Sequence, residues 1–152
     1  MAAIITREEP TAPEVAALIA ELDELLTPLY PRESRHGYSV EKLTAESVAF
    51  FVIREEGFPA GCGGIKLFGS DYGEIKRMFV RPQFRGLGLA KLILSHLSDY
   101  AKYNGVRILR LETGVHQTAA IGLYERMGFA RISAFGEYTD DPLSRYYEKR
   151  LE

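Results

Sequence analysis

The sequence has little cysteine, no long apolar run and no secretory leader, and each absence excludes a class of protein. Its single cysteine, Cys62, allows no internal disulfide and is typical of a reducing compartment. No stretch approaches the ~20 consecutive apolar residues that a transmembrane helix needs. The segment from Met1 to Ile5 lacks the basic and apolar parts of a signal peptide. We therefore expect a cytoplasmic protein without a membrane partner.

Charge is also close to balance, which argues against a nucleic-acid partner. The chain carries 19 Lys and Arg against 21 Asp and Glu, a net charge of −2, whereas general nucleic-acid binders carry a strong basic excess. No spacing of Cys, His and Asp residues indicates a metal site. With 152 residues and no repeats or linkers, we expect one domain over residues 1–152, as a monomer or homodimer.

Hydrophobic periodicity and turn residues predict an α/β fold. A helix over residues 15–26 is expected after a capping box at Thr11-Ala12-Pro13-Glu14, and a short helix over 40–43. A long helix runs from about Leu89 to a stop at Asn104-Gly105, and another spans 117–127. Hairpins come first and βαβ units later, so the sheet should be mixed. Strands are expected at residues 3–6, 47–54, 60–68, 75–80, 106–113, 130–133 and 145–151.

A basic, glycine-containing turn lies between the central strand and the long helix. Gly86 and Gly88 carry no side chains, so backbone N–H groups and the positive end of the helix dipole are open to an anion. Arg81 and Arg85 add positive charge. The dinucleotide fingerprint G-x-G-x-x-G fails because Lys91 occupies its last position, and the chain has no P-loop. The turn predicts a phosphate-bearing ligand of another kind.

Two motifs together resemble the GNAT superfamily of N-acetyltransferases. Gln83-x-x-Gly86-x-Gly88 is similar to the loop with which that family grips the pyrophosphate of acetyl-CoA. Gln117-x-x-Ala120-x-x-Leu123-Tyr124-x-x-x-Gly128-Phe129 is similar to the family's late helix and following turn. The resemblance covers roughly Val48 to the C-terminus. It implies the GNAT fold, a mixed sheet of about seven strands with flanking helices, and acetyl-CoA as cosubstrate.

The resemblance also assigns cofactor contacts. In GNAT proteins the sheet splays beside the central strand and the pantetheine arm enters the gap, which implies contacts with the backbone of Met78, Phe79 and Val80. Gln117 stands where the family usually has asparagine, with the same donor and acceptor but a different reach. Tyr124 faces the cofactor as well. The pyrophosphate is assigned to the N–H groups of Arg85, Gly86, Leu87, Gly88, Leu89 and Ala90.

Acetyl transfer to an amine needs a base for the ammonium and an acid for the departing thiolate. By resemblance Tyr124 is the acid; alternatively it is a core aromatic. Glu74 opens the predicted central strand, where the family often has a glutamate, and is the leading base. Glu112 on the next strand is its rival, unless it is a surface charge paired with Arg110. His116 or a water relay are further alternatives.

By the same resemblance, two segments should line the substrate-binding side of the sheet. Residues 30–38 carry Arg32, Arg35 and His36, while residues 135–144 carry Tyr138 among acidic residues. Arginine suits a bidentate grip on a carboxylate. We therefore expect an acceptor with both an amine and a carboxylate, such as an amino acid. The alternative is that both loops are merely solvated and the arginines are paired with surface acids.

The expected activity is N-acetylation of a primary amine on a small molecule. Two other functions stay open from the sequence alone. The chain could acetylate proteins or peptides, or it could be a catalytically silent sensor that binds acyl-CoA. Tyr124 and the candidate bases favour an enzyme over a sensor, and the lack of an appended recognition domain favours a small acceptor.

Overall fold

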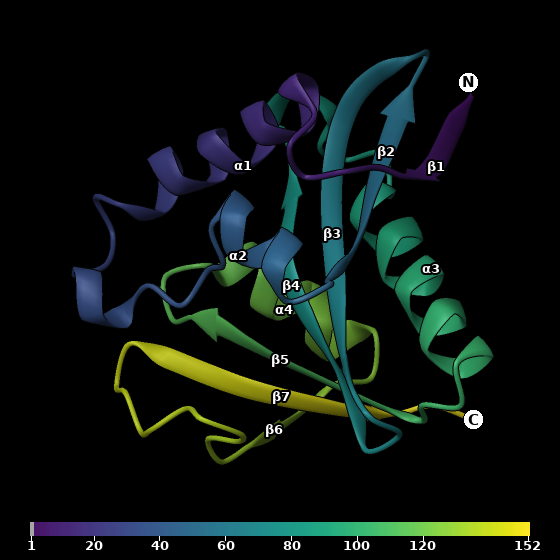
Figure 1. Cartoon of the computed structure of the whole chain (residues 1–152). Coiled ribbons are helices and arrows are strands. Elements are labelled where there is room, and N and C mark those ends of the chain that lie inside the picture. The colour runs from purple at the N-terminus through teal and green to yellow at the C-terminus, as the bar shows by residue number, and fades with distance from the viewer. Residues whose placement is uncertain (1) are drawn as a thin grey trace.

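The computed structural model describes residues 2–152, which form a seven-stranded mixed sheet flanked by helices (Figure 1). The order across the sheet is β1-β2-β3-β4-β5-β7-β6, and the predicted fold class is confirmed. The strands are β1 (Ala3–Arg7), β2 (Ala49–Glu55), β3 (Phe58–Phe68), β4 (Tyr72–Val80), β5 (Ile108–Gly114), β6 (Ala130–Ile132) and β7 (Ser144–Arg150). The helices are α1 (Pro13–Leu26), α2 (Val40–Ala45), α3 (Leu89–Tyr103) and α4 (Thr118–Arg126), with short 3-10 turns η1 (Arg32–Ser34) and η2 (Pro82–Phe84).

The sheet opens between its two central strands. β4 and β5 are parallel and pair only at Gly73–Leu109 and Glu74–Arg110. On its other side, β4 stays paired with β3 as far as Val80. Backbone groups of β4 beyond Glu74 therefore have no partner strand on the β5 side. The gap is the one that the family resemblance implied, and Figure 1 shows the two strands diverging.

A bulge bends β4 inside this open region. Between the Cys62–Phe79 and Gly64–Lys76 pairs, β4 uses one residue more than β3. Arg77 takes a left-handed conformation there, with φ of 58°, which is uncommon for a residue with a side chain. Gly63 faces the bulge, and a Cβ on it would lie 2.7 Å from the Met78 sulfur. Close packing and the extra residue together set the direction of the side chains at the bulge.

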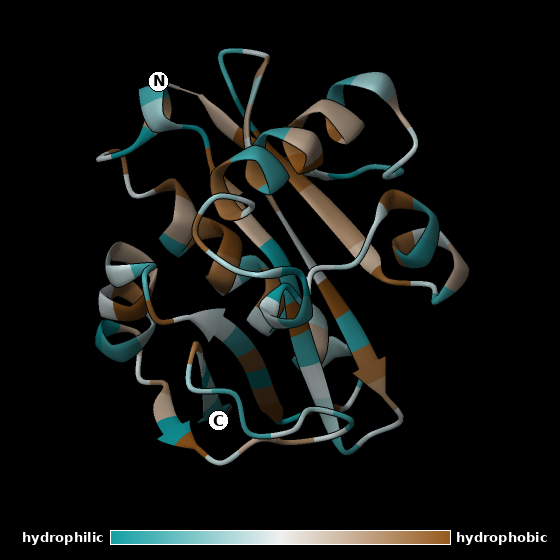
Figure 2. Cartoon of the chain, turned by 90° about the vertical axis from the view of Figure 1, so that its left-hand side faces the viewer, coloured by the Kyte–Doolittle hydropathy of each residue, from teal (hydrophilic) through white to brown (hydrophobic). Residues whose placement is uncertain are grey.

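Two helices cover each face of the sheet, α3 and α4 on one face and α1 and α2 on the other. A separate hydrophobic core lies between the sheet and each pair of helices. Ala49, Phe51 and Ile53 of β2 pack on the face of α3 and α4, whereas Phe50 and Val52 pack on the face of α1 and α2. Figure 2 shows hydrophobic residues concentrated along the central strands and the helices that cover them. Burial of each large apolar side chain stabilises the fold by about 1.5–3 kcal/mol. No helix within residues 2–152 has the length and apolarity to cross a membrane.

The capping box predicted at Thr11 is wrong. α1 begins at Pro13, its N-cap is Ala12, and no side chain caps it. A residue before proline is pushed into the extended region, and Ala12 has φ −61° and ψ 137°. Pro13 therefore fixes the start of α1. With Thr11 as the N-cap, the helix would have begun one residue earlier. The predicted stop of α3 is confirmed, with Asn104 as C-cap and Gly105 at φ 77°.

Two strands begin earlier than predicted. β3 begins at Phe58 and includes Pro59, because the register shift between Ile53 and Arg54 lets the ladder pass a residue without an N–H group. β4 begins at Tyr72, so Glu74 lies inside the strand rather than at its opening. Local sequence marked Tyr72 and Gly73 as turn residues, but their pairing with Phe68 and Leu67 extends the ladder.

Candidate active site

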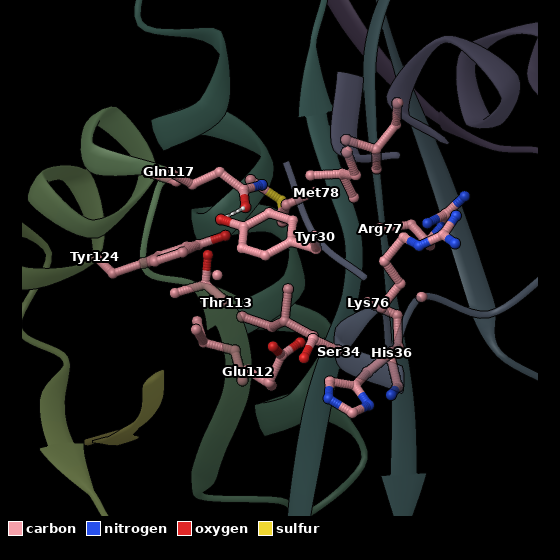
Figure 3. Close-up of a pocket in the computed structure, with 18 of the residues that line it drawn as sticks. Tyr30, Ser34, His36, Lys76, Arg77, Met78, Glu112, Thr113, Gln117 and Tyr124 are labelled. Carbon is pink, nitrogen blue, oxygen red and sulfur yellow. Dashed lines mark hydrogen bonds between the residues drawn. The ribbon is translucent and has the colours of Figure 1, made fainter. Parts of the chain in front are cut away.

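A pocket lies where β4 and β5 separate (Figure 3). Side chains from both strands, from α4 and from the segment after α1 surround it. The segment between α1 and α2, residues 27–39, is called the acceptor loop below. The pocket is lined by Leu22, Leu26, Tyr30, Ser34, Arg35, His36, Gly37, Ile75, Lys76, Arg77, Met78, Leu111, Glu112, Thr113, Gly114, Gln117, Ala120, Tyr124 and Tyr138.

Tyr124 combines a core ring with a hydroxyl in the pocket. Its ring is buried and packs against Phe129 and Tyr147, with centroids 5.7 Å and 6.5 Å away. Its hydroxyl points toward Tyr30 and Thr113 (Figure 3). Burial raises the pKa of the phenol above its ordinary value. The hydroxyl is therefore kept protonated, which is the state that a proton donor needs.

Glu112 is a partly buried carboxyl in the same pocket. Its Oε2 accepts a hydrogen bond from the Ser144 hydroxyl at 2.8 Å. Burial raises the pKa of Glu112, while the Ser144 hydrogen bond and the positive charges of His36 and Lys76 oppose that rise. Arg110, its sequence-based partner, donates instead to Glu148 at 2.8 Å. A carboxyl whose pKa is raised toward the working range is suited to accept a proton.

Glu74 is occupied by internal partners. Its carboxylate lies 2.8 Å from the Lys76 ammonium and accepts a hydrogen bond from the Tyr138 hydroxyl at 2.5 Å. Glu74 and Lys76 are only 4% and 6% exposed, and Glu74 does not line the pocket. Glu74 is therefore not a strand-end carboxylate that faces water. Because β4 begins before Glu74, the side chain is buried among its neighbours.

The glycine turn leaves the start of α3 open. Gly88 is the N-cap with φ 77°, Gly86 has φ 83°, and no side chain caps the helix. A Cβ at either glycine would meet no atom within 4 Å. Leu87 is 47% exposed, Leu89 is buried and Ala90 is partly buried. The first amides of the helix therefore face open space on the side of the two glycines.

The arginines beside this turn differ in their contacts. Arg81 is held by Glu21 of α1, with its Nε 2.9 Å from the carboxylate, and it donates to the Pro59 carbonyl. Its charge is thereby neutralised, contrary to the expectation that it adds to the turn. Arg85 is exposed and donates from Nε to the Val80 carbonyl at 3.1 Å. Its backbone N–H bonds to the Pro82 carbonyl, so this amide is not open as its neighbours are.

The three β4 residues assigned to pantetheine lie along the open edge of the strand. Met78 lines the pocket, Phe79 is buried on the α1 face, and Val80 is partly buried. Their backbone runs beyond the last β4–β5 pair, which is at Glu74. An extended ligand lying in the gap could thus pair with this backbone as a strand would.

The acceptor loop brings Arg35 and His36 to the pocket but not Arg32. Arg35 is exposed and donates from Nη1 to the Thr27 hydroxyl at 3.2 Å. His36 lies 3.7 Å from Asp141 and edge-on to Tyr138, with ring centroids 5.4 Å apart. Arg32 is exposed in η1 and does not line the pocket. In the described part of the chain, neither arginine forms an ion pair with Glu33.

Several pocket residues escaped the sequence analysis. Lys76 and Arg77 were not among the candidate site residues, yet both line the pocket. Arg77 is 7% exposed, forms an ion pair with Asp23 of α1 at 2.7 Å and donates to the Ile19 carbonyl. Two adjacent charges inside an otherwise apolar strand were the available signal. Ser144 gave no such signal.

The cations around the pocket are mostly neutralised. Lys76 is paired with Glu74, Arg77 with Asp23 and His36 with Asp141. Arg35 is the pocket cation that has no acidic partner within residues 2–152. No cluster of metal-ligating side chains occurs in that part of the chain. The pocket thus offers the unpaired guanidinium of Arg35, the partly buried carboxyl of Glu112 and the protonated phenol of Tyr124.

The chain is similar to known acetyltransferases in both sequence and fold. Residues 19–129 match the model of the acetyltransferase (GNAT) family. The chain is 43% identical to IAA acetyltransferase of Azospirillum brasilense over 97% of both chains. A solved acyl-CoA N-acyltransferase structure from Klebsiella pneumoniae is 38% identical, with a TM-score of 0.84 and 99% and 98% of the two chains covered. N-acetylglutamate synthase of Neisseria gonorrhoeae, solved with coenzyme A and N-acetyl-glutamate, shares the fold at 24% identity and a TM-score of 0.79; the match covers 100% of this chain and 36% of that one.

Proposed function

The chain belongs to the GNAT family of acetyltransferases, and we propose that it acetylates the primary amine of a small molecule that also carries a carboxylate, such as an amino acid. One observation carries this proposal. A single pocket contains the unpaired guanidinium of Arg35, the partly buried carboxyl of Glu112 and the hydroxyl of Tyr124. These three groups match the three needs of such an acceptor: a grip on its carboxylate, a base for its ammonium and an acid for the leaving group.

Acetyl-CoA is the proposed acetyl donor. The open amides from Gly86 to Ala90, in the glycine turn and at the start of α3, suit its pyrophosphate, because a helix N-terminus without a side-chain cap attracts anions. The unpaired edge of β4 at Met78, Phe79 and Val80 suits its pantetheine arm. When bound, acetyl-CoA supplies the acetyl group on a thioester and leaves as the thiol.

Two residues of this chain would handle the protons. The acceptor nitrogen loses two protons in forming the amide, while the carbon–sulfur bond breaks and the sulfur needs one. We assign the first proton to Glu112, directly or through a water, from where it passes to solvent. Tyr124 donates a proton to the sulfur and regains one from the newly formed amide nitrogen. The raised pKa of each group supports its role, since Glu112 must bind a proton and Tyr124 must hold one.

Arg35 would hold the acceptor carboxylate. A guanidinium offers two parallel N–H donors to a carboxylate, and Arg35 uses only Nη1 for Thr27. A hydrogen bond to a charged group contributes about 1.5–3 kcal/mol, or roughly a 10- to 100-fold preference. The pairing of Lys76, Arg77 and His36 with internal acids leaves Arg35 as the cation best placed for this contact.

The test compares an amino acid with the amine that its decarboxylation gives. Wild type should show a kcat/KM about 10- to 100-fold higher for the amino acid. Arg35→Ala should lose this preference, mainly through KM for the amino acid. Arg32→Ala is the matched control, because Arg32 lies on the same loop outside the pocket, and it should keep the preference. Equal kcat/KM for both acceptors in wild type would refute the proposal and redirect the search to polyamines, aryl amines and peptides.

A further inference from the structure

The hydroxyl of Tyr30 links the acceptor loop to the start of α4 through hydrogen bonds. Tyr30 donates a hydrogen bond to Oε1 of Gln117 at 2.8 Å (Figure 3). It also accepts one from the backbone N–H of His116 at 2.9 Å. Its ring also packs against the His116 ring at 5.4 Å. Tyr30 is 5% exposed, and both hydrogen bonds are partly buried. The loop thus joins a helix that lies almost ninety residues further along the chain.

A glycine leaves the space that the Tyr30 hydroxyl occupies. Gly114 ends β5, and a Cβ there would lie 2.1 Å from the Tyr30 oxygen. Any other residue at this position would displace the tyrosine, since such an approach involves the rigid ring and not a flexible side-chain end. The position of the Tyr30 hydroxyl therefore depends on three neighbours: Gly114, which leaves space for it, and the two groups that hydrogen-bond to it, Gln117 Oε1 and the His116 N–H.

A second attachment holds the other end of the loop. His36 lies 3.7 Å from Asp141, and hydrogen bonds from the Leu143 N–H and then the Ser34 hydroxyl lower the pKa of that carboxyl. Arg35 lies between the two attachments, next to His36. Tyr124 lies on the helix whose N-cap is Gln117. The Tyr30–Gln117 bond therefore links the acceptor loop to the helix that carries the proposed acid.

We propose that Tyr30 and Gln117 are a positioning pair that sets the affinity for the acceptor. In this arrangement the side-chain oxygen of Gln117 serves the loop, so its main role is not the cofactor contact that the family resemblance suggested. Neither residue needs to touch the reacting atoms. The inference rests on the proposed function only in taking the loop to face the acceptor.

Four variants separate the two roles of Gln117. Tyr30→Phe and Gln117→Leu each remove the bond, Gln117→Glu keeps an oxygen at the same reach, and the fourth combines Tyr30→Phe with Gln117→Leu. The acceptor is whichever amine wild type turns over fastest, so the result does not depend on the carboxylate proposal. Acetyl-CoA affinity is measured by calorimetry, and hydrogen exchange of residues 27–39 is followed without any acceptor.

The positioning pair predicts a specific pattern. Tyr30→Phe and Gln117→Leu should raise the acceptor KM about 3- to 30-fold, since a buried partner is left unsatisfied. The acetyl-CoA Kd should change less than about twofold. Gln117→Glu should keep an acceptor KM close to that of wild type. The double variant should raise the acceptor KM no further than the more impaired of the two single variants does. Exchange of residues 27–39 should be faster wherever the bond is lost.

Two outcomes would overturn the inference. If Gln117→Leu and Gln117→Glu both weaken acetyl-CoA binding while Tyr30→Phe does not, Gln117 is a cofactor contact. If Tyr30→Phe leaves both the acceptor KM and the exchange of residues 27–39 unchanged, the bond does not position the loop. Should Tyr30→Phe fail to fold, Gln117→Leu probes the same bond from the other side. A failure of the carboxylate proposal would appear in none of these measurements.

Discussion

The Ser144 hydroxyl donates a hydrogen bond to the carboxylate of Glu112 at 2.8 Å, across the β5–β7 ladder. In that ladder Ser144 pairs with Gly114, two residues beyond Glu112, so the contact is diagonal. Ser144 is 6% exposed, and a buried hydrogen bond of this kind favours the ionised carboxylate. The strand pair therefore tunes the group that we propose as the base.

Replacing Ser144 with alanine should shift the pH–rate profile. The hydrogen bond lowers the pKa of Glu112, so its loss should raise that pKa further above its ordinary value. A base works only when it is ionised, and the acidic limb of kcat/KM should therefore move to higher pH. Ser70→Ala, in the exposed turn between β3 and β4, is the control. A limb that stays in place in Ser144→Ala would separate Glu112 from the rate.

Much of the framework could be predicted because its signals are local. Short apolar runs bounded by turn residues mark the strands, Asn104-Gly105 ends α3, and Gly86 and Gly88 open the phosphate turn within a few residues. Contacts between distant segments leave no such mark. The Glu21 carboxylate that neutralises Arg81 is sixty residues away.

The same limit applied to the candidate base. Local sequence placed Glu74 at the opening of a strand, where a carboxylate would face water. Tyr138, whose hydroxyl binds Glu74, is sixty-four residues away on another loop. Burial by such distant partners could not be read from the residues around Glu74. The structure thus favours Glu112 on the basis of packing that the sequence does not display.

Glu112→Gln and Glu74→Gln should fail in different ways. Glu112→Gln should lower kcat about 10²- to 10⁴-fold and remove the acidic limb, because an amide cannot accept the proton. Glu74→Gln should retain the limb but lower the melting temperature, since Lys76 would stay buried without its counter-charge. Rate profiles and thermal denaturation of both variants provide the check. Loss of the limb only in Glu74→Gln would return the role of base to Glu74.

Tyr124→Phe tests the acid and leaves the core ring in place. Removal of the hydroxyl alone should reduce kcat about 10²- to 10⁴-fold, with little change in acetyl-CoA affinity. The packing against Phe129 and Tyr147 is kept, so the melting temperature should stay close to that of wild type. Stopped-flow kinetics with calorimetry would separate the two effects. A wild-type kcat would assign Tyr124 to the core alone.

Gly88→Asp tests the proposed pyrophosphate site at the start of α3. The carboxylate would stand where the open amides face an anion, and like charges repel, so acetyl-CoA binding should fall below detection. The fold should persist, because an added Cβ meets no atom within 4 Å, although the left-handed φ of 77° costs about 1–2 kcal/mol.

Gly57→Asp isolates the charge effect from that backbone cost. Gly57 also has a positive φ, of 83°, and an equally open Cβ position, but it lies in the turn between β2 and β3. Both variants should therefore lose similar stability in thermal denaturation. Only Gly88→Asp should lose acetyl-CoA binding in calorimetry. If a folded Gly88→Asp protein binds acetyl-CoA as tightly as Gly57→Asp does, the pyrophosphate lies elsewhere, and the open amides of α3 serve another anion.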